Sequence, residues 1–322
     1  MWDFHRYFFS VGYMSAFKKK GTSMDYDFVA LPDRKPLKWP GNQRIALIMT
    51  INLEYWEQTR DQTEPLYAGG PATIPFPVPG NVPDYVNWTW REYGQRVGIW
   101  RMLDCFDKAG IPASCTMNAK MALERPRIIQ AVNERGWELV PHNWAQNDIL
   151  TFYADAPEKE REVINKTLQV YRDVVGRPAK GWLSSSLRPT ANTVEILKEA
   201  DLMFFCDFLN DDQPYLIRTK HGPMVCVPYS NDVNDFNMFA RGGMTLDQGL
   251  AALKEQFNVL YEEGKSSMRI MNFGLHPHVI GQPYRIRALG DFLDYVKGFD
   301  AVWFPTREEI AEWYLQHHHE HI

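Results

Sequence analysis

The hydrophobic pattern of this chain alternates between short apolar runs and longer segments with helical periodicity. The strongest run, RIALIMTINL at 44–53, is almost continuously apolar, which is typical of a strand that is covered on both faces. Further strands are predicted at 113–117, 137–140, 180–183, 203–205, 224–227, 269–275 and 302–305. The periodicity between and after them predicts helices at 96–109, 126–135, 157–175, 193–200, 246–263, 284–296 and 308–315.

Repeated strand–helix units favour parallel strands joined by crossover helices. Such units build either an open doubly wound sheet or a closed barrel, and seven or eight of them without an obvious linker favour the barrel. We therefore predict an α/β fold, a distorted (β/α) barrel, in a single domain over residues 25–316. The polar start, 1–24, is expected to be a poorly ordered extension or an interface arm, and the histidine-rich end, 317–322, a solvated tail.

The segment 57–87 is rich in glycine and proline. So many breakers exclude regular structure over this stretch. A loop of this length without elements of its own is usually functional or an interaction arm, and this one directly follows the first predicted strand.

Composition narrows the ligands that the chain can bind. The net charge of -5 and the pI near 6.0 argue against a nucleic-acid or anionic membrane surface, because both need a clustered positive field. No predicted strand is followed by a GxGxxG or GxxxxGKS fingerprint, so nothing supports a dinucleotide or P-loop nucleotide site. The expected partner is a small molecule that is not polyanionic, with no nucleic acid and no membrane.

Cysteine usage and the absence of export signals favour the cytoplasm. The four cysteines lie far apart beside apolar runs and form no CxxC pair, which indicates buried thiols in a reducing compartment. The start of the chain has no continuous apolar core of a secretory signal, and no stretch approaches the roughly 20 apolar residues that span a bilayer.

Polar residues that follow the predicted strands form a chemically coherent set. In a βα barrel the carboxyl ends of the strands meet at one face, so their side chains can share a pocket. Carboxylates with two or three imidazoles supply what amide hydrolysis requires: a base for water, an acid for the leaving nitrogen and donors for the oxyanion. A lone histidine at a strand end is more often structural, but several in one barrel reverse that expectation. The set comprises Asn52, Glu54, His142, Gln146, Asn147, Ser186, Asp207, Tyr229 and His276.

Ordered motifs from about Tyr26 to the end of the chain carry a family resemblance. The chain resembles the polysaccharide deacetylase superfamily, and within it the branch that contains the metal-independent type of allantoinase and related cyclic-imide or amide hydrolases. This resemblance implies a barrel of about seven strands, homo-oligomeric assembly as a dimer or tetramer, and hydrolysis of C–N bonds other than peptide bonds. The motifs are RKPLKWP at 34–40, NLEYW at 52–56, WREYGQRVGIWR at 90–101, GWELVPHNWAQN at 136–147, GWLSSS at 181–186, CDFLNDDQPY at 206–215, VPYSNDVND at 227–235 and LHPHVIGQPYRIRAL at 275–289.

The resemblance also bears on a metal cofactor. Metal-dependent members of the superfamily bind zinc or a similar ion through one Asp and two His spaced as HxxxH. Here Glu54, His142 and Gln146 stand at those positions, and an amide oxygen is a poor ligand for such an ion. No cofactor is therefore expected; a divalent, zinc-like metal, if present, would take these three residues as ligands.

Without a metal ion, a carboxylate and hydrogen-bond donors must activate the water, which suits imides and ureides better than ordinary acetamides. We hypothesise that Glu54 or Asp207 is the base and that His142 or His276 protonates the departing nitrogen. His278 either supports a catalytic group or is an ordinary loop residue. The residues expected to hold the substrate or its oxyanion are Asn52, Trp56, Tyr93, Arg96, Asn147, Ser186 and Tyr229.

Two other functions stay open on the sequence alone. One is a metal-dependent deacetylase of an N-acetylated saccharide. The other is a catalytically degenerate barrel that binds a ligand or serves as a structural protein. Four titratable groups at strand ends, Glu54, His142, Asp207 and His276, speak against the second alternative, because a structural role does not require them.

Overall fold

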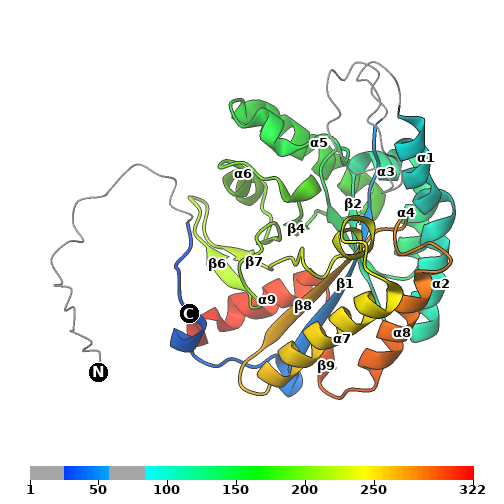
Figure 1. The fold of residues 1–322 in the computed structure, drawn as a ribbon. Coiled ribbons are helices and arrows are strands. Elements are labelled where there is room, and N and C mark those ends of the chain that lie inside the picture. Colours follow the sequence, from blue (N-terminus) through cyan, green and yellow to red (C-terminus); the bar gives the residue numbers. More distant parts are fainter. Residues whose placement is uncertain (1–24, 58–83) are drawn as a thin grey trace, which may run out of the picture.

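The central strand of the larger sheet is β1, Ile45–Leu53, in the computed structural model, which describes residues 25–57 and 84–322 (Figure 1). The strand order is β3-β2-β1-β8, and β9 also pairs with β1. All of these pairings are parallel. The other strands of this sheet are β2 Ser114–Met117, β3 Glu138–Pro141, β8 Arg269–Leu275 and β9 Val302–Trp303.

The smaller sheet has the order β4-β5-β7-β6, in which only β6 is antiparallel to its neighbour among the described strands. Backbone hydrogen bonds link the two sheets through residues just beyond their strands. Leu183 N–H, directly after β4, donates to Pro141 O of β3 at 3.2 Å, and Gly274 N–H of β8 donates to Val233 O in the loop after β7 at 3.2 Å. The predicted α/β fold is confirmed. The described residues hold nine strands in the two sheets together. The four in the smaller sheet are short: β4 Gly181–Trp182, β5 Phe204–Phe205, β6 Tyr215–Ile217 and β7 Met224–Cys226.

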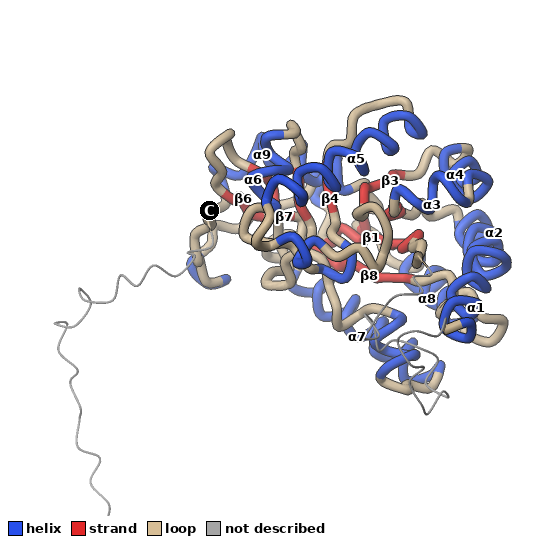
Figure 2. The backbone as a smooth tube through the Cα atoms, turned by 90° about the horizontal axis from the view of Figure 1, so that it is seen from above, coloured by secondary structure: helices blue, strands red, loops and turns tan. Residues whose placement is uncertain are grey.

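Helices surround the strands, as the view from above shows (Figure 2). The helices predicted at 157–175 and 246–263 begin and end at the same residues in the structure. The helices are α1 Tyr85–Tyr93, α2 Ile99–Ala109, α3 Ala119–Glu124, α4 Pro126–Asn133, α5 Pro157–Val175, α6 Thr193–Glu199, α7 Leu246–Glu263, α8 Ile286–Lys297 and α9 Arg307–His317.

Both faces of β1 are buried, which explains its unbroken apolar run. Ile45 and Leu47 belong to the outer core, together with residues of α2 and α8. Ala46 and Ile48, on the opposite face, belong to the inner core with Phe204 of the smaller sheet. Because side chains alternate across a strand, a strand between two cores needs apolar residues at nearly every position.

Two predicted segments are corrected by the structure. The breaker-rich segment was expected to reach residue 87, but α1 begins at Tyr85, where the Asp84 side chain accepts from Asn87 N–H as an N-cap. The end at 317–322 is not a solvated tail: α9 reaches His317, and His321 is 2% exposed. The predicted extension 1–24 and most of the breaker-rich segment lie outside the described residues. No helix in the described part of the chain is long and apolar enough to cross a membrane.

Candidate active site

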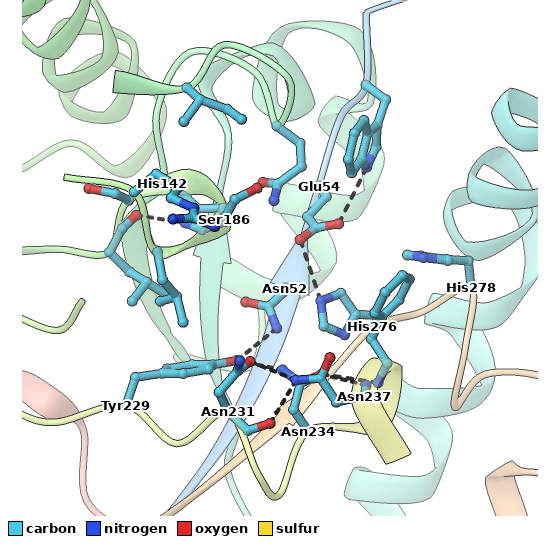
Figure 3. Close-up of a pocket in the computed structure, with 18 of the residues that line it drawn as sticks. Asn52, Glu54, His142, Ser186, Tyr229, Asn231, Asn234, Asn237, His276 and His278 are labelled. Atoms are coloured by element: carbon cyan, nitrogen blue, oxygen red, sulfur yellow. Dashed lines mark hydrogen bonds and ion pairs between the residues drawn. The ribbon is translucent and has the colours of Figure 1, made fainter. Parts of the chain in front are cut away.

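A cavity of about 310 Å³ lies at the carboxyl ends of the strands, within the size range of small-molecule sites. It brings together eight residues that the sequence had singled out, from segments as distant as β1 and β8. Figure 3 shows the ten labelled residues around it, with Glu54 between His142 and His276. The predicted residues at the cavity are Asn52, Glu54, Trp56, His142, Gln146, Ser186, Tyr229 and His276.

A carboxylate–imidazole–carboxylate chain crosses one wall of the cavity. His276 Nδ1 lies 2.6 Å from Asp235 Oδ1, and His276 Nε2 lies 3.4 Å from Glu54 Oε1. Burial alone would lower the pKa of His276, but the two carboxylates outweigh it and raise this pKa to about 10. Burial would likewise raise the pKa of Glu54, but the attraction and hydrogen bond from His276 lower it to about 2. At neutral pH the Asp235–His276–Glu54 series therefore holds an imidazolium between two carboxylates.

Trp56 holds the other oxygen of the Glu54 carboxylate. Its indole Nε1–H donates to Glu54 Oε2 at 3.4 Å. The Arg91 guanidinium lies 3.7 Å from the centre of the Trp56 ring, in a cation–π contact. Glu54 is thus held from two sides, with its side chain 9% exposed.

His142 lies directly after β3 and has one tautomer. Its Nδ1–H donates to Leu183 O at 2.6 Å, because a carbonyl oxygen can only accept. Burial lowers the pKa of His142, although the attraction to Glu54 and the bond to Leu183 oppose this shift. His142 is therefore a neutral imidazole at neutral pH, and the lone pair is on Nε2.

Neutral amide and phenol groups form the floor of the cavity. Asn52 Nδ2 and Asn234 Nδ2 both donate to the Tyr229 hydroxyl at 3.3 Å (Figure 3). Asn52 also donates to Leu275 O at 3.2 Å and accepts from Thr116 Oγ1 at 3.0 Å. Burial raises the pKa of Tyr229 to about 12, so the phenol keeps its proton. The floor can donate to and accept from a polar uncharged ligand.

Close packing of glycines fixes the loop that carries His276. A one-turn π-helix, Gly94–Gly98, lies between α1 and α2. A Cβ at Gly98 would overlap Pro277 O, and a Cβ at Gly281 would come within 2.6 Å of Gly98 Cα. The extra residue of a π-helix and the missing side chains let two backbones approach, so α1 and α2 position the loop that follows β8.

Four predicted site residues do not line this cavity. Asp207 lies behind Ser184, whose N–H donates to Asp207 Oδ1 at 2.6 Å, and burial raises the pKa of Asp207 to about 7. Tyr93 accepts from Arg101, and Arg96 has a side chain that is 74% exposed. Asn147 bonds both the N–H and the carbonyl of Glu57, each at 2.9 Å, so it fixes the chain after β1.

Asp235 was missed, although the motif at 227–235 contains it. This carboxylate is completely buried and also accepts from the backbone N–H groups of His276 at 2.8 Å and Ile280 at 3.1 Å. Nothing in the motif distinguishes Asp235 from the exposed Asp232 three residues earlier. His278, left open between two roles, lines the cavity, as do Asn231, Asn234, Phe236, Asn237, Arg188 and Arg241.

The donor set does not fit a zinc ion. Glu54 already lies against the His276 imidazolium and accepts from Trp56, and the neighbouring positive charge opposes binding of a cation. The third position holds Gln146, which offers a weakly ligating amide. Within residues 25–57 and 84–322, no group of three His, Cys, Asp or Glu side chains is arranged to hold a metal ion. The chemistry derived for this cavity is therefore that of its own acids and bases.

Comparisons with known proteins agree with the motifs. A family model described as Polysaccharide deacetylase matches residues 87–205. A candidate polysaccharide deacetylase of Schizosaccharomyces pombe is 28% identical over 303 residues, covering 87% of this chain and 93% of that protein.

Two crystal structures have a similar fold over most of this chain. A probable polysaccharide deacetylase from Pseudomonas aeruginosa PAO1 is 28% identical, with a TM-score of 0.77, and the match covers 87% of this chain and 94% of that one. The Puue allantoinase is 29% identical, with a TM-score of 0.76, and the match covers 87% of this chain and 93% of that one.

Proposed function

We propose that this chain, whose residues 87–205 match a polysaccharide deacetylase family model, hydrolyses a non-peptide C–N bond in a small cyclic or linear amide, imide or ureide. The observation that carries the proposal is the Asp235–His276–Glu54 chain facing a neutral His142 in one cavity. Such a pair of differently charged imidazoles provides an acid and a base at the same pH. The Puue allantoinase is as similar to this chain as the polysaccharide deacetylases are, and the poor fit of the donor set to zinc favours an imide or ureide over an acetylated sugar.

In the proposed reaction, His142 Nε2 accepts a proton from a water molecule, which attacks the carbonyl carbon. Glu54 has a low pKa and is a poor base, so its role is to orient the water and to keep His276 protonated. As the C–N bond breaks, the His276 imidazolium donates its Nε2 proton to the leaving nitrogen. The amide N–H of Asn234 that Tyr229 does not engage stabilises the oxyanion.

A substrate panel tests the proposal. Purified, chelator-treated protein is assayed against imides, ureides, formamides and N-acetylated saccharides, and we expect turnover in the first two classes. Glu54→Gln is expected to lower kcat by about 10²- to 10⁴-fold, because it removes the charge that orients water and holds the imidazolium. Glu255→Gln, an exposed change on α7, is the matched control and should leave kcat unaltered.

Three outcomes would overturn the proposal. Turnover of none of the four classes would favour a degenerate barrel. Turnover restricted to acetylated saccharides and restored by added zinc would favour a metal-dependent deacetylase. Undiminished turnover by Glu54→Gln would remove the assigned site.

A further inference from the structure

Three histidines line the cavity, and the reaction proposed above uses two of them. The tautomer of His142 is fixed by Leu183 O, and the proton on His276 Nδ1 is held by Asp235. His278 has no such partner: within the described residues, neither of its ring nitrogens makes a hydrogen bond. Its ring is therefore the one imidazole of the three whose polar atoms no described residue engages.

Apolar contacts hold the His278 ring in place. The Trp90 ring meets it edge-on with centroids 4.6 Å apart, and the Phe236 ring lies 6.3 Å away. Behind it, the absence of a side chain at Gly94 lets the π-helix pack against the His278 backbone. A ring that packing fixes in one position can present its nitrogens to a ligand without first being ordered.

Neither nitrogen of His278 is fully enclosed, and the residue lines the cavity. The residue is 5% exposed, yet neither nitrogen is among the fully enclosed atoms without a partner. Burial, followed by repulsion from the His276 cation, lowers the pKa of His278 well below its usual value, so the ring is neutral. A neutral ring offers one donor and one acceptor, and either nitrogen can take either role when the tautomer is free.

We propose that His278 is a specificity-determining residue, whose ring nitrogens hydrogen-bond an N–H or C=O group of the substrate beside the reacting bond. The centroids of His276 and His278 are 5.7 Å apart, so a small planar ligand can meet both rings (Figure 3). The ligand class is a compound with adjacent N–H and C=O groups, such as a cyclic imide or ureide. This inference rests on the proposed function for its substrate, but binding tests it without turnover.

The test uses hydantoin as the probe and titration calorimetry as the measurement. The parent protein is the Glu54→Gln variant, in which hydrolysis is suppressed, and each substitution of His278 is added to it. His278→Phe keeps the ring that packs on Trp90 and removes its nitrogens, and we expect at least about tenfold weaker binding with an unchanged melting temperature. His278→Gln restores a donor and an acceptor and should retain more affinity than the Phe variant. His221→Gln, an exposed change, is the control.

Equal affinity in the parent, Phe and Gln variants would overturn the assignment, as would a parent that does not bind hydantoin. If the Phe variant is unfolded, the Gln variant alone decides: affinity no higher than that of a His278→Ala variant overturns the proposal. Failure of the proposed function is read separately, from the absence of turnover by the wild type across the substrate panel.

Discussion

Two histidines in one cavity differ in charge because their neighbours differ. His276 lies between two carboxylates, whereas His142 bonds a carbonyl and is farther from any anion than His276 is. Burial disfavours the cation in both rings, and only the paired anions around His276 overcome it. The division of labour between acid and base is thus set by the residues that surround each ring.

This difference in charge predicts that kcat is constant over a broad range of pH. His142 must be neutral to act as the base, so kcat should fall on the acid side as it takes up a proton, at a pH below 6.5. His276 must be charged to act as the acid, so kcat should fall on the alkaline side as it loses its proton near pH 10. The measurement is kcat against pH with a substrate that does not titrate over this range. An activity that rises through pH 10 would contradict the assignment of His276 as the acid.

Asp235 should determine where the alkaline fall occurs. In Asp235→Asn the amide oxygen can still accept from His276, but the anion that raises the pKa of His276 is gone. We expect kcat to drop by about 10²- to 10⁴-fold and the alkaline fall to move to lower pH. The exposed neighbour Asp232→Asn is the matched control. A variant with lower kcat but an unmoved alkaline fall would show that Asp235 has only a structural role.

At the scale of elements, the π-helix Gly94–Gly98 connects the helical shell to the catalytic loop. Gly98→Ala would drive a methyl group into Pro277 O, so the loop after β8 must shift. We expect a destabilisation of about 1–3 kcal/mol and a lower kcat, because His276 moves with Pro277. Gly290→Ala in α8 is the control, since its Cβ would meet only Cys105 Sγ at an ordinary 3.7 Å. Thermal unfolding and kcat are measured on the Gly98→Ala and Gly290→Ala variants. Equal melting temperatures and equal kcat values would disprove the coupling between the π-helix and the loop after β8.

Long elements were predictable because local signals mark their ends. α5 begins with Pro157 at its first turn and is followed by Gly176 in the left-handed conformation, and Thr245 precedes α7 as the N-cap of a capping box. β6, with three residues, and the π-helix, which depends on one extra residue in a turn, leave no such signal. Their existence depends on tertiary packing, which a sequence pattern does not contain.

The site was predictable only in part, for the same reason. Glu54, His142 and His276 lie at or just beyond the ends of strands in the larger sheet, where topology alone brings them together. Asp207 also follows a strand, but it lies behind Ser184, and Asp235 reaches His276 from a different loop. Which way a residue points after a strand ends depends on the loop conformation, and this is not encoded in spacing.

At the scale of the whole molecule, the two ends of the described chain are packed together. Lys35 N–H donates to His321 O at 3.2 Å, and Arg34 forms a 2.6 Å ion pair with Asp211 in the loop after β5. The C-terminal turn therefore packs against the segment around Lys35 rather than extending into solvent. Homo-oligomeric assembly, implied by the family resemblance, stays a prediction.

His321 should make this packing sensitive to acid. Its side chain packs against Tyr314, and burial lowers its pKa to about 4 from an ordinary value of 6.5. The folded state therefore favours the neutral ring, and the resulting stability is present above pH 6.5 and is lost as the pH falls towards 4. We expect the free energy of unfolding to drop by about 1–3 kcal/mol over this interval in the wild type and by less in His321→Gln. The control is the exposed His319→Gln variant, which should behave as the wild type does. Denaturant unfolding at pH 4.5 and 7 gives the free energy of unfolding of all three proteins. An equal drop in this free energy in the wild type and in His321→Gln would exclude His321 as the source.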